Sequence, residues 1–339
     1  MRVAARYAYI GDLQMKRYNI AVVGVGAVGI EMLRCLRRRN FPIKELRVFA
    51  RSSREIEVDG QKYSVDAISP EGFEGIDIAL FAGTEGEKGA AVAFAPEAIK
   101  RGAVVIDNGA DFRMKKDVPL VIPEVNPEDA EKHKGIIANP NCSTIQMVVA
   151  LWPIYKKAGI KRIIACSYQA VSGAGRGGVI QLESELEGKD VLEKTFAYPI
   201  ARNVIPQIGE FGDFDYTSEE WKMVNETHKI MHDKSIKISA TCVRVPVKTG
   251  HSEAIYLETK KNIGADMIRE LLVESSGIKV IDQPLTSYPL PIEAEGKDEV
   301  FVGRIRKDPF LKNGLWLWVV SDNLLKGAAL NAIQIAELL

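Results

Sequence analysis

The stretch YNIAVVGVGAVG, residues 18–29, decides the fold of this chain. Its first half is apolar and β-branched, which is typical of a buried strand. Its second half carries the glycine pattern GxGxxG, and a helical pattern follows directly. In such a unit the first glycine permits the turn, the second lets the backbone approach a pyrophosphate, and the third lets the helix pack on the strand. The stretch therefore predicts a dinucleotide-binding domain, with a purely structural glycine turn as the alternative.

A second apolar run, residues 46–49, ends where a dinucleotide fold contacts the adenine ribose. An Asp or Glu at this turn accepts a hydrogen bond from the 2′-hydroxyl of NAD, whereas an Arg accommodates the 2′-phosphate of NADP. This chain has Arg51, Ser52 and Ser53 at the turn, and no acidic residue before Glu55. The turn favours NADP as the cofactor, and a solvated basic turn is the alternative.

The remaining strand-like runs divide the chain into two parts. In the first part they alternate with a helix expected over residues 87–101, and this alternation predicts a mostly parallel, doubly wound α/β sheet of the Rossmann type. In the second part the runs lie closer together, which predicts an α+β domain over residues 143–322. We expect the first domain to comprise residues 16–142 and a returning helix within 323–339, and residues 1–15 to form a loose extension. The expected strands are residues 76–82, 103–106, 135–138, 163–171, 236–247, 252–259 and 315–321; a glycine loop is expected at 172–178 and a short helix at 227–232.

The composition excludes several classes of function. The chain has 45 basic and 45 acidic side chains, which argues against a nucleic-acid or membrane-surface partner. No apolar run reaches transmembrane length and the start of the chain lacks a signal-peptide core, so we expect a cytoplasmic protein. The four cysteines form no CxxC pair, which indicates neither a disulfide framework nor a zinc site. His228 and His232 have the spacing of a metal pair but no evident third ligand, so we expect no metal.

Cys142 is the candidate nucleophile, because it lies where a loop turns into a helix. In ANPNCSTIQ, residues 138–146, Pro140 excludes a helix through itself, Asn141 suits a helix cap, and an apolar helical run begins at Ser143. Unpaired N–H groups and the positive end of the helix dipole favour a thiolate at such a position. The alternative is a small buried apolar residue. The proton-transfer partner that we favour is His251, which follows RVPVKTG at a strand end or turn.

A dinucleotide fold, a helix-capping cysteine and a histidine together suggest an aldehyde dehydrogenase that works through a thioester. Eight motifs stand in the order of one known family, and on them the chain resembles the aspartate-semialdehyde dehydrogenases. The motifs are GVGAVG (24–29), the turn ARSS (50–53), PEVNP (123–127), NPNCSTIQ (139–146), SYQAVSGAG (167–175), EEWKMVNETHKI (219–230), RVPVKTGHSE (244–253) and DNLLKGAALNAIQIAE (322–337). One departure is the segment 109–111, which reads Gly-Ala-Asp where many relatives have Ser-Ser-Ala.

The resemblance implies a role for each matching residue. Cys142 would be the nucleophile, His251 the general acid and base, and Gln169 a residue that positions the thiol and the intermediate. The implied substrate contacts are Arg244 to the carboxylate, Glu219 to the amino group, and Lys222, Arg113 and Asn141 to phosphate or the acyl-phosphate. The implied cofactor contacts are Gly24, Gly26, Ala27, Val28, Gly29, Arg51, Ser52, Ser53, Gly173 and Asn323, with Asn323 at the nicotinamide.

The implied reaction is the reversible, NADPH-dependent conversion of L-aspartyl 4-phosphate to L-aspartate 4-semialdehyde and phosphate. This reaction belongs to the biosynthesis of lysine through diaminopimelate, of methionine and of threonine. The resemblance also implies a homodimer or homotetramer built through the second domain. Two alternatives are another phosphate-dependent, thioester-forming reductase, such as N-acetyl-glutamyl-phosphate reductase or glyceraldehyde-3-phosphate dehydrogenase, and a catalytically idle dinucleotide-binding regulator.

Overall fold

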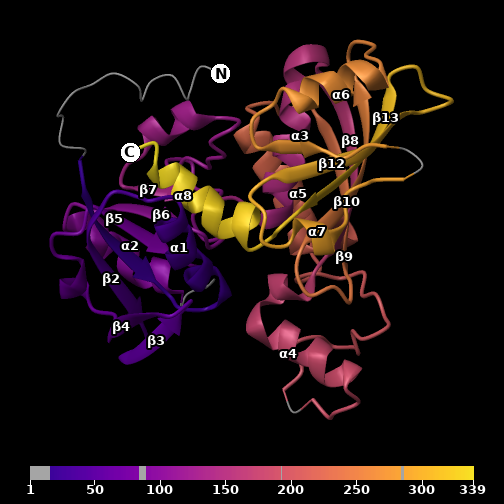
Figure 1. Ribbon diagram of the computed structural model, residues 1–339. Coiled ribbons are helices and arrows are strands. Elements are labelled where there is room, and N and C mark those ends of the chain that lie inside the picture. Colours follow the sequence, from indigo (N-terminus) through magenta and orange to yellow (C-terminus); the bar gives the residue numbers. More distant parts are fainter. Residues whose placement is uncertain (1–15, 84–88, 192, 284–285) are drawn as a thin grey trace.

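Two β-sheets organise the chain in the computed structural model (Figure 1). The structure describes residues 16–83, 89–191, 193–283 and 286–339, and the expected extension at residues 1–15 lies outside them. The first sheet has seven strands in the order β3-β4-β2-β1-β5-β6-β7, and the second has six in the order β11-β12-β13-β10-β8-β9.

The first sheet is parallel except at its β3–β4 edge, which confirms the predicted doubly wound α/β class. One face packs against α1 and the C-terminal helix, and the other packs against α2. The strands are β1 (Tyr18–Val23), β2 (Ile43–Ala50), β3 (Arg54–Val58), β4 (Gln61–Ala67), β5 (Ile78–Phe81), β6 (Val104–Asp107) and β7 (Ile136–Ala138). The helices are α1 (Ala27–Arg38), α2 (Ala90–Lys100) and α8 (Leu330–Ala336), the last preceded by a π-helical turn, η6 (Leu325–Ala329).

The second sheet is mixed, as predicted for an α+β arrangement. Its central strands β8, β10 and β13 pair antiparallel, whereas β8–β9 and β11–β12 are parallel. Helix α3 is apolar on nearly every side and lies buried in the core over this sheet. The strands are β8 (Ile160–Gln169), β9 (Lys237–Arg244), β10 (His251–Thr259), β11 (Ile278–Val280), β12 (Val300–Lys307) and β13 (Gly314–Ser321). The helices are α3 (Cys142–Ala158), α4 (Gly175–Leu186), α5 (Ser218–Ile230), α6 (Ala265–Val273) and α7 (Pro291–Ala294).

Two local predictions for the second part of the chain were wrong. The expected glycine loop at 172–178 is a 3-10 turn, η4 (Val171–Ala174), that leads into α4. Glycines are needed inside this helix because of close packing: a Cβ at Gly177 would lie 2.5 Å from the Thr195 hydroxyl, and a Cβ at Gly178 would lie 2.5 Å from a backbone oxygen. The expected helix at 227–232 had the wrong bounds: residues 227–230 are helical, but they form the end of α5, which starts nine residues earlier at a capping box formed by Thr217 and Glu220.

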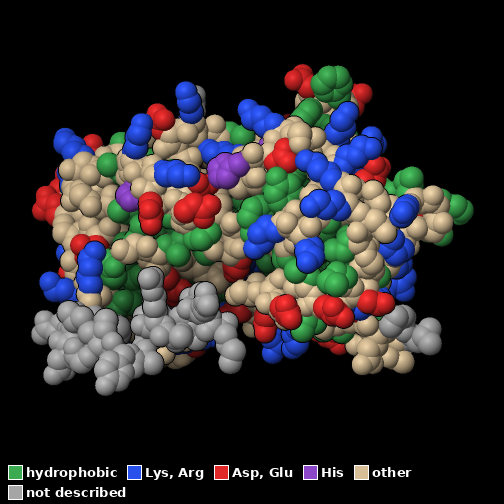
Figure 2. Space-filling view, turned by 90° about the horizontal axis from the view of Figure 1, so that it is seen from above, with side chains coloured by type: hydrophobic (Ala, Val, Ile, Leu, Met, Phe, Trp, Pro, Cys, Tyr) green, Lys and Arg blue, Asp and Glu red, His purple; other side chains and the backbone are tan. Residues whose placement is uncertain are grey.

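Charged side chains are mixed over the surface. On the face in Figure 2, Lys and Arg side chains lie beside Asp and Glu side chains over both parts of the molecule. This distribution agrees with the balance of 45 basic and 45 acidic residues. Among the described residues, no helix is both long and apolar enough to cross a membrane.

The glycine turn generates a prediction with a matched control. A Cβ at Gly29 would lie 1.9 Å from the Gly24 carbonyl oxygen, so Gly29→Ala should lower stability by at least about 1–3 kcal/mol, the usual cost of overpacking. Gly26 has an ordinary φ of −76° and open space around its Cβ position, so Gly26→Ala should keep the wild-type melting temperature. Thermal melting of the two variants measures the difference, and equal melting temperatures would contradict this account of the turn.

Candidate active site

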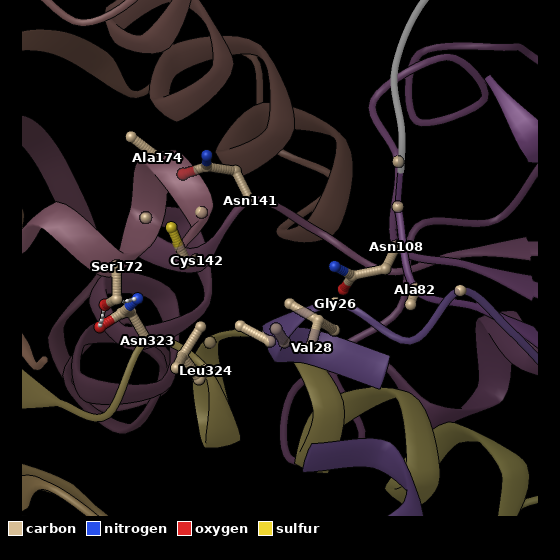
Figure 3. A pocket seen from close by; sticks show the side chains of 18 of the residues that line it. Gly26, Val28, Ala82, Asn108, Asn141, Cys142, Ser172, Ala174, Asn323 and Leu324 are labelled. Carbon is tan, nitrogen blue, oxygen red and sulfur yellow. Dashed lines mark hydrogen bonds between the residues drawn. The ribbon is translucent and has the colours of Figure 1, made fainter. Parts of the chain in front are cut away.

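A cleft of about 660 Å³ runs between the glycine turn of the first sheet and the loops of the second. Figure 3 shows the Cys142 sulfur beside Asn141, Ser172 and Ala174, with Gly26 across the cleft. The residues that line this cleft are far apart in the sequence. They include both the glycine turn predicted to bind the cofactor and the predicted nucleophile, Cys142.

Cys142 is the first residue of α3, as the sequence predicted. The Asn141 side chain caps the helix, and its oxygen accepts from the N–H groups of Ser143 (3.0 Å) and Thr144 (3.2 Å). The surroundings of Cys142 do not favour the thiolate that the sequence predicted. Although Cys142 keeps some surface in the cleft, desolvation by the surrounding protein and the negative charge of Glu219 raise the pKa of its thiol to about 12. Desolvation therefore raises the thiol pKa by more than the helix N-terminus lowers it.

Glu219 lies at the centre of a hydrogen-bonded group beside the thiol. Its Oε1 accepts from Asn141 Nδ2 at 2.9 Å and from Gln169 Nε2 at 3.2 Å. Its Oε2 lies 3.5 Å from Lys222 Nζ. Burial opposes ionisation, but Lys222 and the two amides outweigh it, so the pKa of Glu219 lies below its ordinary value. Three of the predicted site residues therefore meet around the carboxylate of a fourth, Glu219.

Arg113 is held by a second buried carboxylate, that of Glu226. Arg113 Nη1 lies 3.1 Å from Glu226 Oε1, and Glu226 Oε2 accepts from the backbone N–H of Asn141 at 2.7 Å. Burial raises the pKa of Glu226 despite the neighbouring guanidinium. Sequence reasoning missed Glu226. The signal was its spacing on α5, because Glu219, Lys222 and Glu226 follow the i, i+3, i+7 pattern of one helix face.

Arg244 and His251 lie at the two ends of the loop that joins β9 to β10, and both bond to the main chain of Ala170. Arg244 ends β9 and donates from Nη1 to the Ala170 carbonyl at 2.7 Å, while His251 starts β10 and accepts at Nδ1 from the Ala170 N–H at 3.0 Å. Burial and the charge of Arg244 hold the pKa of His251 well below 6.5. A Cβ at Gly173 would lie 2.8 Å from Arg244 Nη1 and 3.1 Å from His251 Nε2. A side chain at position 173 would therefore displace Arg244 and press against His251.

The C-terminal segment lines the cleft beside Cys142. Asn323 Oδ1 accepts from the Gly250 N–H at 2.9 Å, and Asn323 Nδ2 donates to Ser172 Oγ at 2.9 Å. Gly327, in the π-helical turn, lines the cleft against Cys142, where an added Cβ would lie 2.9 Å from the Cys142 Cβ. Sequence reasoning placed Asn323 in the site but missed Gly327, because only the packing of the turn shows how close it comes to the cysteine.

The cofactor half of the cleft fits a dinucleotide. Gly24, Gly26, Ala27, Val28 and Gly29 all line it, and the open space at Gly26 lets a pyrophosphate approach the start of α1. The predicted ribose contacts form a separate group of exposed residues just beyond the carboxyl end of β2, namely Arg51, Ser52 and Ser53. Ser53 Oγ already accepts from the Ala67 N–H at 2.9 Å. In the described part of the chain, no cluster of three or more His, Cys, Asp or Glu side chains is arranged to hold a metal ion.

The fold and the site together define a dinucleotide-dependent dehydrogenase with a cysteine at the start of a buried helix. The chain matches the family models for the semialdehyde dehydrogenase NAD binding domain, over residues 19–133, and the semialdehyde dehydrogenase dimerisation domain, over residues 151–326. It is 54% identical to the aspartate-semialdehyde dehydrogenase of Aquifex aeolicus (95% of this chain, 98% of that protein) and 49% identical to that of Bacillus subtilis (94% and 96%). The chain belongs to the aspartate-semialdehyde dehydrogenase family.

Solved structures agree with this assignment. Aspartate semialdehyde dehydrogenase II from Vibrio cholerae, in its complex with ASA, superposes with a TM-score of 0.90 at 45% identity, covering 95% of this chain and 98% of that one. The enzyme of Candida albicans, solved with NADP, superposes with a TM-score of 0.74 at 26% identity, with the same coverage of 95% and 98%. The resemblance seen in the motifs is therefore confirmed at the level of family and fold.

The acidity of Cys142 can be measured by alkylation. With a thiol pKa of about 12, the rate of reaction with iodoacetamide should rise steadily with pH through the neutral range, because only the thiolate reacts. Glu219→Gln removes the charge that disfavours the thiolate and should raise the rate at fixed pH by roughly tenfold. Peptide mapping identifies the modified cysteine, with Cys142→Ser as the blank. A rate that levels off near neutral pH would instead indicate a stable thiolate.

Proposed function

We propose that this chain reduces L-aspartyl 4-phosphate to L-aspartate 4-semialdehyde with NADPH, through a thioester on Cys142. The observation that carries the proposal is the position of Cys142 at the start of α3, between the glycine turn and a set of charged side chains. The related Vibrio cholerae enzyme was solved in complex with ASA. That complex supports a substrate of the same kind in the corresponding cleft.

The charges around the cysteine suit a small substrate with an amino group and two anionic groups. Arg244 presents a planar guanidinium to the cleft, which suits a carboxylate. Glu219 is ionised and can pair with an ammonium group. Lys222 and Arg113 line the cleft beside Asn141, and we assign this trio to the phosphate.

The first step is transfer of the acyl group to sulfur. The Cys142 sulfur bonds to the acyl carbon, the bond from that carbon to the phosphate oxygen breaks, and the phosphate leaves with the electron pair. The proton that the thiol loses is transferred to the departing phosphate, so that atoms and charge balance. We assign Gln169, whose amide donates to Glu219 at 3.2 Å, to positioning the thiol and the intermediate, and His251 to acid–base chemistry. Covalent capture divides one difficult exchange into two easier ones.

NADP is the cofactor that we propose, held by Gly24, Gly26, Ala27, Val28 and Gly29. When bound, its reduced form supplies the hydride that converts the thioester to the aldehyde. We assign the adenine ribose phosphate to Arg51, Ser52 and Ser53, and the nicotinamide end to Gly173 and Asn323. The solved NADP complex of the Candida albicans relative supports this choice.

The proposal also covers the domain division, the oligomeric state and the metabolic role. We propose an NADP-binding domain of residues 16–142 and 323–339, and a catalytic and dimerisation domain of residues 143–322. Packing of α8 against α1 supports this division, as does the core that α3 shares with the second sheet. A homodimer or homotetramer is supported by the dimerisation-domain model over residues 151–326. The product would serve the cytoplasmic biosynthesis of lysine, methionine and threonine.

The phosphate site gives the decisive test. Wild type should form NADPH from aspartate semialdehyde only when phosphate is present. Lys222→Ala should raise the KM for phosphate roughly ten- to hundredfold, the effect of losing a charged hydrogen bond, with little change in NADP binding. Arg244→Ala should instead raise the KM for the semialdehyde, and Cys142→Ser should abolish turnover while it still binds NADP. NADPH formation by the wild type without phosphate would overturn the proposal.

Cofactor choice depends on the turn after β2. Arg51→Ala should weaken NADP binding by on the order of 1.5–3 kcal/mol, because a charge-assisted hydrogen bond to the 2′-phosphate is lost, and should leave NAD binding nearly unchanged. Fluorescence titration with each reduced cofactor measures both effects on one preparation. If both affinities fell equally, Arg51 would not be the residue that distinguishes them.

A further inference from the structure

Lys229 lies near the end of α5, on the helix face that carries charged residues of the cleft. Glu219, Lys222, Glu226 and Lys229 follow one another at intervals of three or four residues, which places them along one side of the helix. Lys222 and Arg113 line the cleft, and Glu226 lies 3.1 Å from Arg113 Nη1. The Lys229 side chain reaches the main chain of the segment that carries Arg113.

The ammonium group of Lys229 makes three hydrogen bonds, all to the main chain of this one segment. Nζ donates to the carbonyl oxygens of Arg113 at 2.6 Å, Lys115 at 2.8 Å and Val118 at 2.7 Å. A carbonyl oxygen can only accept, so the nitrogen supplies three protons, which requires the charged form of lysine. Charge-assisted hydrogen bonds of this kind are roughly twice as strong as neutral ones. Lys229 is therefore a firm anchor for residues 113–118.

The segment 113–118 needs such an anchor because it consists of turns and bends, without helix or strand. Its own main-chain hydrogen bonds are short in range: the Lys115 N–H donates to Phe112 O at 3.0 Å, and the Val118 N–H donates to Lys115 O at 3.3 Å. Neither bond connects the segment to another element, and the side chains of residues 114–117 are exposed. The contact with Lys229 is what ties the three carbonyl groups to α5.

Helix α5 therefore holds Arg113 by both its side chain and its main chain. Glu226 pairs with the guanidinium at 3.1 Å, and Lys229 binds the carbonyl oxygen of the same residue at 2.6 Å. Lys222, on the same face of α5, is the second cation that lines the cleft here. Because both cations are fixed to one helix, the distance between them depends on how firmly α5 holds the segment of Arg113.

We propose that Lys229 is a positioning residue for phosphate: by binding three carbonyl oxygens of residues 113–118, it fixes Arg113 relative to Lys222 and so determines the affinity of the site for phosphate. Lys229 acts through Arg113, because its own three protons are used by the main chain. A guanidinium binds phosphate oxygens through N–H groups of fixed geometry, so a displaced Arg113 loses these bonds. The effect on phosphate rests on the proposed function, whereas the anchoring of the segment does not.

Amide hydrogen exchange of the full-length protein tests the anchoring without any substrate. In Lys229→Met, which has a side chain of similar length but no N–H donor, peptides that cover residues 112–118 should lose protection, while peptides from β1 and β8 keep wild-type exchange. Lys234→Met, which replaces an exposed lysine, is the matched control and should exchange like the wild type. Where Lys229→Met does not fold, Lys229→Gln retains two donors and should show a smaller loss of protection. Unchanged exchange of residues 112–118 would overturn the anchoring.

The KM for phosphate tests the positioning role. Lys229→Met should raise this KM roughly tenfold, since a misplacement of about 1 Å by a distant substitution can cost up to about a hundredfold. The KM for the semialdehyde and the affinity for NADP should keep their wild-type values. In an Arg113→Ala background, Lys229→Met should have no further effect on the phosphate KM, because Lys229 acts through Arg113.

Three outcomes separate the possible failures. A full additional effect of Lys229→Met in the Arg113→Ala background would overturn the positioning role, and so would an equal rise in the KM for phosphate and for the semialdehyde. NADPH formation by the wild type without phosphate would instead overturn the proposed function. The exchange measurement would stand in that case, because it uses neither phosphate nor semialdehyde.

Discussion

The active site depends on one buried carboxylate, Glu226, which holds the turn that starts α3. One oxygen accepts from the Asn141 N–H at 2.7 Å, and the other lies 3.1 Å from Arg113 Nη1. A buried carboxylate is costly unless its oxygens are paired, and here each has a donor. Arg113 in turn donates to the Asn139 carbonyl at 2.9 Å. The same contacts therefore fix Asn139 and Asn141, the residues on either side of Pro140, together with the Arg113 guanidinium.

The environment of the cysteine combines opposing influences. Desolvation and Glu219 favour the thiol, whereas Arg113, Arg244 and the Ser143 N–H favour the thiolate, and the first pair prevails. The acidity of Cys142 therefore depends on the side chains that pack around it.

Much of the fold and part of the site are predictable from local sequence signals. Pro140 and Asn141 correctly indicated where α3 begins, because both act within a single turn. Glu226 was missed, because its partners lie on two other segments of the chain. The segment after Val171 was predicted as a loop from its glycines, yet it is helical, because those glycines serve close packing against Thr195 and a backbone oxygen.

The sequence by itself determined the strand, glycine turn and helix at residues 18–38, the cap before Cys142 and the family to which the chain belongs. These features rest on interactions between residues close in the chain or on motifs of fixed spacing. Only the tertiary structure decided the acidity of Cys142 and the arrangement of Arg244, Ala170 and His251. The physical reason is that desolvation and hydrogen-bond partners depend on which distant segments pack around a group, and spacing along the chain does not specify that packing.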